Sequence, residues 1–300
     1  MRPNMRRIAV LAMLVGVVVS LQGCSLVNKL RAKNELNEGV RTFNKGKYEE
    51  SKVIFEQALE YDPDNVNARF FYAMSVNALF EKSLNSQEVD KSGSIQLGQQ
   101  TIDAFQKVYD KAPDLKFKDR AISFMAKAYK SLRDQVYDPK TDKAQYDEAR
   151  AKYLGYLEQR VNLEGQTNDV KAQMFYTIGD DHWKEAHEII EGYAKKDPAT
   201  PAAPPTYPDL PADKLPQINA AIAKSHEYMQ KAIAMDPNYP EPYLGEKLLY
   251  LEEAKLATDP AKKDAVRAKV EQWDEQYREK LSDQQTAQAA EAPPEGASGQ

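Results

Sequence analysis

The 300-residue chain carries 41 Lys and Arg against 46 Asp and Glu, which gives a formal net charge of −5, and it contains a single cysteine. This acidic balance argues against nucleic acid as a partner, because nucleic-acid-binding proteins usually present a basic face. One cysteine can form neither an internal disulfide nor a thiolate zinc cluster. We therefore expect no nucleic-acid partner and no metal held by thiolates.

The first 24 residues are typical of an export signal. A basic segment, an uncharged apolar run and a cysteine follow one another: Arg2, Arg6 and Arg7, then residues 8–20, then Leu21-Gln22-Gly23-Cys24. The apolar run is shorter than the roughly 20 residues that a membrane span needs. This order resembles the signal peptide and lipobox of bacterial lipoproteins, which implies a signal over residues 1–23, a lipid on Cys24 and a tether over residues 24–31. An uncleaved anchor or a chance match to the lipobox is the alternative.

The same resemblance implies a location. In enteric lipoproteins a serine after the lipidated cysteine, as Ser25 is here, favours the outer membrane. We therefore expect a protein that is lipid-anchored to the outer membrane and faces the periplasm, with inner-membrane anchoring as the alternative. Each buried methylene of the acyl chains contributes about 0.8 kcal/mol, so such an anchor is long-lived.

Residues 32–65 form the first unit of a repeat. Leu36, Val40 and Phe43 give one helix an apolar stripe, a turn follows at Gly46, and a second helix ends at Asp62-Pro63. Proline ends a helix because it lacks an amide donor and clashes with the preceding turn. A helical pair of about 34 residues cannot bury its apolar face alone and needs neighbouring copies.

The spacing of this unit recurs along the chain. An apolar residue precedes a proline by eight positions three times: Phe55 and Pro63, Phe105 and Pro113, Met229 and Pro237. A fourth copy, from Tyr146 to Tyr153, lacks the proline. Matching first helices are predicted over residues 66–79, 119–132, 169–183 and 240–253, and a looser last helix over 261–280.

These motifs resemble the tetratricopeptide-repeat (TPR) family. The resemblance implies an all-α, right-handed TPR-like helical-hairpin solenoid of about five repeats over residues 32–281. Residues 282–300 lack apolar periodicity and are predicted to be a disordered tail.

Three turns within repeats are longer than the family pattern. Residues 81–95 contain Ser92-Gly93-Ser94 as a loop signal, residues 133–143 contain a turn at Asp138-Pro139, and residues 197–216 hold seven prolines, which excludes a helix there. The helix before the proline-rich segment is expected to continue to Ala194. Since all three insertions occupy the same place in the repeat, stacking should align them along one edge. Either this edge has a function, or the insertions lie there because a turn is where added residues destabilise the fold least.

The TPR resemblance implies a groove lined by the first helices of the repeats. The residues expected to bind a partner there are Phe43, Asn44, Phe70, Met74, Asn77, Lys127, Lys130, Tyr176 and Trp183, with Ser123, Asp180, Leu244 and Leu248 on the same faces. Chaperone-binding members grip a terminal carboxylate, but Leu36 and Val40 stand where the first gripping residues are expected. An amphipathic helix or an extended peptide therefore fits the groove better.

Catalytic motifs are missing from the sequence. It has no GxSxG, no Walker loop and no glycine-rich dinucleotide turn, and His182 and His187 are five apart, whereas helical zinc pairs are four apart. Nearby acidic residues leave a loose metal site at these histidines as a minor alternative. We expect no enzyme, no cofactor and no metal.

The expected function is a lipid-anchored scaffold that binds an envelope protein or peptide segment. Similar lipoproteins serve outer-membrane β-barrel assembly, pilus secretin assembly or the control of peptidoglycan enzymes, and the sequence does not select among them. One alternative is an envelope enzyme or carbohydrate-binding lipoprotein with a site near the fourth repeat, around His182 and Trp183. Another is self-association through the repeats.

Overall fold

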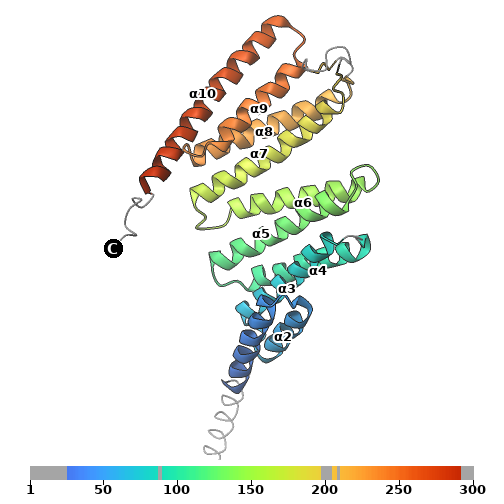
Figure 1. Ribbon diagram of the computed structural model, residues 1–300, viewed down its shortest axis with the longest axis vertical. Coiled ribbons are helices and arrows are strands. Elements are labelled where there is room, and N and C mark those ends of the chain that lie inside the picture. The colour runs from blue at the N-terminus through green and yellow to red at the C-terminus, as the bar shows by residue number, and fades with distance from the viewer. Residues whose placement is uncertain (1–25, 87–89, 197–204, 208–209, 292–300) are drawn as a thin grey trace, which may run out of the picture. The chain divides into compact units, whose positions relative to one another are not determined.

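The computed structural model describes residues 26–86, 90–196, 205–207 and 210–291, with the side chains of 287–291 left out (Figure 1). It consists of helices joined by turns, with one isolated bridge between Lys195 and Thr206. The predicted solenoid divides into two compact units, one up to Tyr156 and one from Leu157, so that the boundary falls inside α6. Among the described helices, none combines the length and the apolar character that a bilayer crossing requires.

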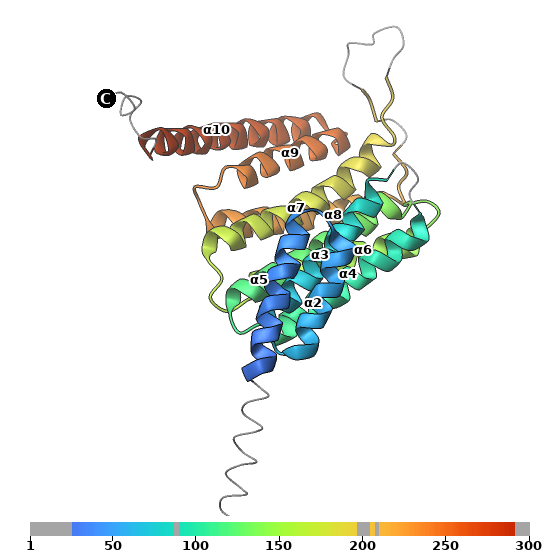
Figure 2. The same cartoon turned by 60° about the horizontal axis from the view of Figure 1, so that its bottom comes forward.

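Unit 1 is a series of antiparallel helices that pack on their neighbours in the chain. A helix over residues 26–44 comes first, and the others follow in order: α2 (Tyr48–Tyr61), α3 (Val66–Leu84), α4 (Lys91–Lys111), α5 (Leu115–Ser131), the π-helical turn η1 (Leu132–Val136) and the start of α6 (Lys143–Val161). Contacts link α2 to α3, α3 to α4 and α4 to α5, as Figure 2 illustrates. This is the helical-hairpin arrangement that the repeats predict.

Two glycines and an asparagine set the geometry of the first repeat. Gly46 has a φ of 75°, so the first turn uses the left-handed conformation that glycine adopts without strain. At Gly39 the helices approach so closely that a Cβ would lie 2.4 Å from the buried ring of Phe55. The side chain of Asn65 caps α3 by accepting a hydrogen bond from the amide of Ala68 at 3.0 Å.

The core of unit 1 is rich in phenylalanine. Phe70 lies 6.0 Å from Phe105 and 5.8 Å from Phe117 by ring centroids, and Phe105 stacks on Phe124 at 4.5 Å. Aromatic side chains dominate the energetics of such cores because each buries a large apolar area. The rings therefore join α3, α4 and α5 into one packed layer.

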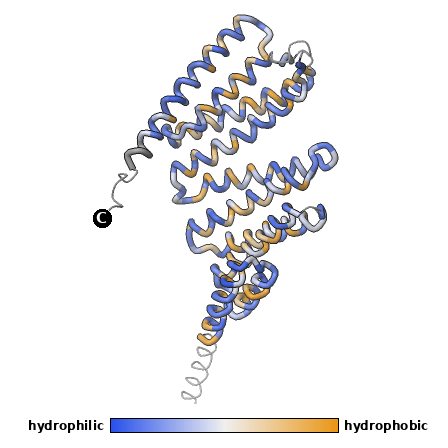
Figure 3. The backbone as a smooth tube through the Cα atoms, in the orientation of Figure 1, coloured by the Kyte–Doolittle hydropathy of each residue, from blue (hydrophilic) through white to orange (hydrophobic). Residues whose placement is uncertain are grey.

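Unit 2 contains the fourth and fifth helical pairs. Its elements after α6 are α7 (Asn168–Glu191), α8 (Leu215–Met235), α9 (Glu241–Leu256) and α10 (Pro260–Glu291). Helix α7 packs on α8, and α9 contacts α7, α8 and α10 (Figure 1). Its core includes Ile190, Ile218, Ile222, Met229 and Leu249, all buried. The α10 tube is coloured mostly as hydrophilic in Figure 3, as expected of a terminal helix that covers a repeat array.

The all-α fold class is confirmed, but several predicted boundaries differ. The predicted loop Ser92-Gly93-Ser94 is wrong, because Asp90 caps α4 and these residues form its first turn. Ser94 is buried there and donates a hydrogen bond to Ser83. The insertion over 81–95 is therefore largely helix, extending α3 and α4, with residues 87–89 outside the described part.

The other two insertions fit the predictions more closely. A turn does occur near Asp138-Pro139, after α5 has widened into the π-helical turn η1. Helix α7 covers most of the predicted extension but ends at Glu191, three residues before the expected end at Ala194. Most of the proline-rich segment lies outside the described residues. The prediction that the non-helical segment extends to Pro216 is wrong by two residues, since α8 begins at Leu215 and Pro216 is tolerated in a first helical turn.

The chain after residue 281 also differs from the prediction. Helix α10 continues to Glu291, so the predicted disorder of the tail does not begin at residue 282. Residues 282–291 contain Ala, Gln and Glu, which are good helix formers, and they precede the first proline of the tail. The signal, Cys24 and residues 292–300 lie outside the described part.

Candidate functional site

A pocket of about 640 Å³ lies in unit 2 between the first helices of the fourth and fifth pairs, α7 and α9. The segment 205–207 and the beginning of α10 complete its walls. Its lining residues are Trp183, His187, Pro205, Thr206, Tyr207, Leu248, Leu251, Glu252, Ala254, Lys255 and Lys263. The structure thus brings together two residues from the predicted groove, Trp183 and Leu248.

Helical spacing explains why these side chains meet. Trp183, His187 and Glu191 follow one another at intervals of four on α7, so they share one face. On α9, Leu248 and Glu252 are also four apart, and Lys255 lies three further on. The pocket forms where these two faces of α7 and α9 oppose each other.

The aromatic wall of the pocket is built by Trp183. Its indole ring stacks on His187, with ring centroids 4.9 Å apart and an interplanar angle of 21°. The indole Nε1 is buried and has no hydrogen-bond acceptor among the described residues. A buried donor is normally paired, so this indole N–H is left with an unmet hydrogen bond.

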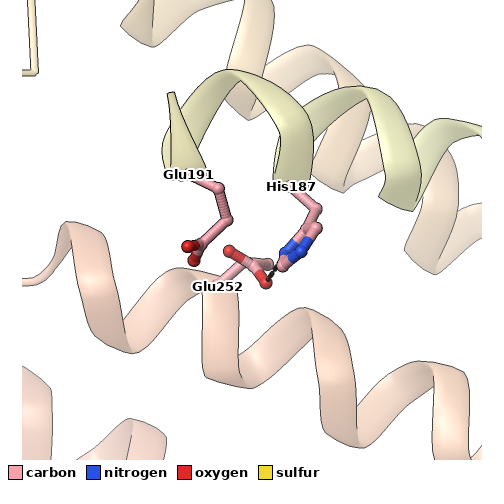
Figure 4. Close-up of side chains that lie close together, drawn as sticks. All are labelled: His187, Glu191 and Glu252. Atoms are coloured by element: carbon pink, nitrogen blue, oxygen red, sulfur yellow. Dashed lines mark hydrogen bonds and ion pairs between the residues drawn. The ribbon is translucent and has the colours of Figure 1, made fainter. Parts of the chain in front are cut away.

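A network of charged side chains forms the polar wall (Figure 4). Glu252 is only 3% exposed, and its Oε1 lies 2.7 Å from Nδ1 of His187. The Lys255 ammonium donates to Glu252 at 2.9 and 3.0 Å and to Glu191 at 2.7 Å. The hydroxyl of Tyr207 donates to Glu191 at 2.8 Å. These bonds tie α7, α9 and the 205–207 segment together.

The pKa values of the network follow from these contacts. Burial by itself lowers the pKa of Lys255, but its hydrogen bonds to Glu191 and Glu252 outweigh burial and raise it. The pKa of Glu191 is lowered by the hydrogen bonds from Lys255 and Tyr207. Burial and the bond to Glu191 raise the pKa of Tyr207. At neutral pH Lys255 is therefore a cation, Glu191 an anion and Tyr207 a neutral phenol.

Ligand-type atoms of His187, Glu191 and Glu252 lie within 4.8 Å of one another, as a metal site requires. The Lys255 ammonium, however, already bonds both carboxylates. A divalent cation has to displace that ammonium before it can bind. The cluster is therefore better described as an ion network in which Lys255 bridges the two carboxylates. The predicted loose site at His182 and His187 does not form as a pair, because the partners of His187 come from one turn later on α7 and from α9.

His182 lies apart from the pocket. Its ring stacks over Tyr228 with centroids 6.1 Å apart, and its Nδ1 lies 3.8 Å from Glu185. The two residues of the alternative site, His182 and Trp183, therefore do not lie together. Trp183 lines the pocket with His187, and His182 does not line it.

The remaining predicted groove residues have mixed positions. In unit 1, Phe43 and Met74 are half-buried and Asn44 is exposed, whereas Phe70 and Asn77 are buried. The expectation that Phe70 and Asn77 line an open groove is wrong. Phe70 belongs to the phenylalanine core, and Asn77 donates a hydrogen bond to Glu81 at 3.0 Å.

Three further predicted residues are engaged in contacts. Lys127 and Lys130 are exposed but pair with Glu81 and Asp134 respectively. In unit 2, Tyr176 is half-buried and meets Tyr239 edge-on at 5.7 Å. Burial, with the nearby carboxylate charge of Asp180, raises the pKa of Tyr176 to about 12.

Sequence reasoning missed most of the pocket. The sequence pattern points to His187 only as a metal ligand, and it does not point to Tyr207, Leu251, Glu252 or Lys255 as site residues. The four-residue spacing from Trp183 to His187 was an available signal. No local signal links α9 to α7, because that contact depends on tertiary packing.

No family model and no curated protein matches the sequence. Among solved structures, the chain is similar to the crystal structure of MamA protein, with 12% identity, 88% of this chain and 98% of that chain covered, and a TM-score of 0.46. It is also similar to the human IFIT1 dimer with m7Gppp-AAAA, with 15% identity and a TM-score of 0.30, where it spans about half of that chain. Because both TM-scores are below 0.5, these similarities are not used to assign the fold. The class of fold, a TPR-like array of helical hairpins, rests on the helix packing described above.

Proposed function

We propose that this protein is a non-catalytic scaffold that binds another protein through the pocket between α7 and α9. The observation that carries the proposal is the place of the pocket, on the opposed faces of the first helices of two consecutive repeats. Grooves between helices commonly receive a helix or an extended peptide by its apolar side chains. Trp183, Leu248 and Leu251 offer such an apolar floor.

The polar lining supports binding rather than catalysis. Glu252 and Lys255 are the acid and base types of side chain in the lining, but they hydrogen-bond to each other and hold the walls in place. A rigid wall reduces the entropy lost on binding. The pocket therefore has the character of a preformed receptor for one or two side chains of a partner.

We propose further that the scaffold acts in the cell envelope. The supporting observation is in the sequence, where a basic segment and an apolar run lead directly to Cys24. A lipid on Cys24 anchors the protein to the outer membrane on its periplasmic side, and the partner is an envelope protein or a peptide segment of one. Replacement of Cys24 by Ser should move the protein from the membrane fraction to the soluble fraction.

The experiment that tests partner binding is photo-crosslinking in living cells. A photoreactive residue replaces Leu251, which lines the pocket and is 38% exposed, and in a control strain it replaces Val53, which is 49% exposed on α2. Both are exposed apolar side chains, so neither replacement should disturb the core. One discrete heterologous adduct at position 251, absent at position 53, is expected.

Two results overturn the proposal. An adduct at position 251 with twice the mass of the chain indicates self-association in place of a separate partner. The lack of any adduct at position 251, with the protein folded and at its normal abundance, removes the pocket as a protein-binding site.

A further inference from the structure

The first helix carries an apolar patch that folding does not cover. Leu26 is 64% exposed, Val27 47% and Leu30 57%, and they are three of the five exposed large hydrophobic side chains in the described chain. Figure 3 shows hydrophobic colour at the start of this helix, beside the grey trace. We call Leu26, Val27 and Leu30 the N-terminal apolar patch.

The three side chains share one face of the helix. Successive helical residues differ by about 100°, so Leu26, Leu30 and Val27 fall within an arc of about 100°. Ala32 and Gly39, which are buried against the rest of unit 1, lie on the opposite side. The patch therefore points away from the fold.

Basic residues flank this patch on both sides. On the same helical projection, Lys29 and Lys33 lie beyond one edge and Arg31 lies beyond the other, and all three are exposed. The guanidinium of Arg31 lies 5.7 Å from the centroid of Tyr61. No acidic residue occurs between Leu26 and Glu35, so these two turns are locally basic in a chain whose net charge is −5.

The apolar character ends after two turns. Asn34 and Asn37 continue the same face and are exposed polar residues. An apolar arc bordered by cations is the pattern of a helix that lies in the interface of a membrane with anionic lipids. Here that pattern is limited to the end of the helix nearest Cys24.

We propose that the N-terminal apolar patch inserts into the surface of an anionic bilayer, with Lys29 and Lys33 bonded to lipid phosphates. The inference rests on the proposed lipidation of Cys24. Leu26 is two residues from that cysteine, and two residues span at most about 7 Å, so the acyl chains hold the patch at the bilayer surface. The helix then acts as a second contact that limits how the first repeat can tilt on the membrane.

The test uses the full lipidated chain. Its only native thiol, Cys24, is capped by lipid, so Leu30→Cys creates a single site for an environment-sensitive fluorophore, and Val53→Cys provides the matched control on α2. Each labelled protein is reconstituted into vesicles of phosphatidylethanolamine and phosphatidylglycerol. The emission of the probe at position 30 should shift to shorter wavelength and be quenched by nitroxide-labelled lipids, whereas the probe at position 53 should show neither effect.

Lipid charge provides the second measurement. The shift at position 30 should shrink in vesicles of neutral phosphatidylcholine and after the double replacement Lys29→Glu and Lys33→Glu. Equal, water-like emission at positions 30 and 53 overturns the inference. A shift that persists without vesicles and grows with protein concentration indicates a second copy on the patch, and also overturns it.

The intact mass separates this inference from the anchoring proposal. A chain without acyl groups refutes lipidation at Cys24 itself. An acylated chain whose probe at position 30 remains in water refutes only the contact of the helix with the bilayer.

Discussion

The buried ion pair between α8 and α9 gives a pH-dependent test of the unit 2 fold. Glu246 is almost fully buried, and its carboxylate lies 2.6 Å from Nδ1 of His226 and accepts a second hydrogen bond from Gln230 at 2.7 Å. Glu253 lies 3.7 Å from the other ring nitrogen. Burial alone lowers the pKa of His226, but the bonds to both carboxylates outweigh it and raise the pKa to about 9.

The direction in which the free energy of unfolding changes with pH follows from proton binding to His226. In the unfolded chain the pKa of His226 is about 6.5, so between pH 6.5 and 9 the folded state holds a proton that the unfolded state has lost. The stabilisation is fully present below pH 6.5 and disappears as the pH rises to about 9. At about 1.4 kcal/mol for each pH unit, the free energy of unfolding should fall by about 3 kcal/mol across this range.

Tryptophan fluorescence isolates this effect, because both tryptophans of the chain, Trp183 and Trp273, lie in unit 2. Urea unfolding is followed at several pH values from 6 to 9.5 for the natural chain and for Glu246→Gln. The variant removes the buried carboxylate while preserving the size of the side chain, so its stability should depend less on pH. Parallel pH curves for the two proteins would refute the assignment of the pH dependence to this pair.

Three further outcomes follow from contacts in the structure. Gly39→Ala should destabilise unit 1 by about 1–3 kcal/mol in thermal unfolding followed by circular dichroism, because its methyl group overlaps the Phe55 ring. Gly155→Ala, with no atom within 4 Å of its Cβ, should instead stabilise the chain by about 0.5–1 kcal/mol, and equal effects of the two changes would contradict this account. Asn65→Ala should cost about 1 kcal/mol in the same measurement, whereas Asn65→Asp should retain the cap of α3. With the photoreactive residue placed instead at Lys263, an exposed residue of the same pocket, Leu251→Glu should abolish the heterologous adduct while leaving unfolding of unit 2 unchanged, and a lowered stability would mean that the Leu251 side chain belongs to the core.

The sequence predicted the helices best where local chemistry decides their ends. Gly46 and Pro63 fix the turns of the first repeat whatever surrounds them, because one needs a positive φ and the other lacks an amide donor. The same reasoning failed at Ser92-Gly93-Ser94, where serine and glycine suggested a loop. There the cap by Asp90 and the burial of Ser94 against Ser83 favour a helix over weak local propensity.

Burial was predicted less well than helical structure. The pattern of a first helix placed Phe70 in the groove, but three neighbouring rings draw it into the core. The apolar stripe of one helix does not determine which of its two edges a neighbouring helix will cover. That choice depends on the side chains of α4 and α5, which approach only in the folded chain.

By itself, the sequence determined the all-α class, the helical pairs and the place of Trp183 on a first helix, because helical periodicity and terminating residues act over a few positions. Only the tertiary structure decided the pocket. His187 and Glu252 are 65 residues apart, and their hydrogen bond exists because α7 and α9 pack together. The energy of a buried carboxylate depends on its partners in space, and no local pattern in the chain specifies those partners.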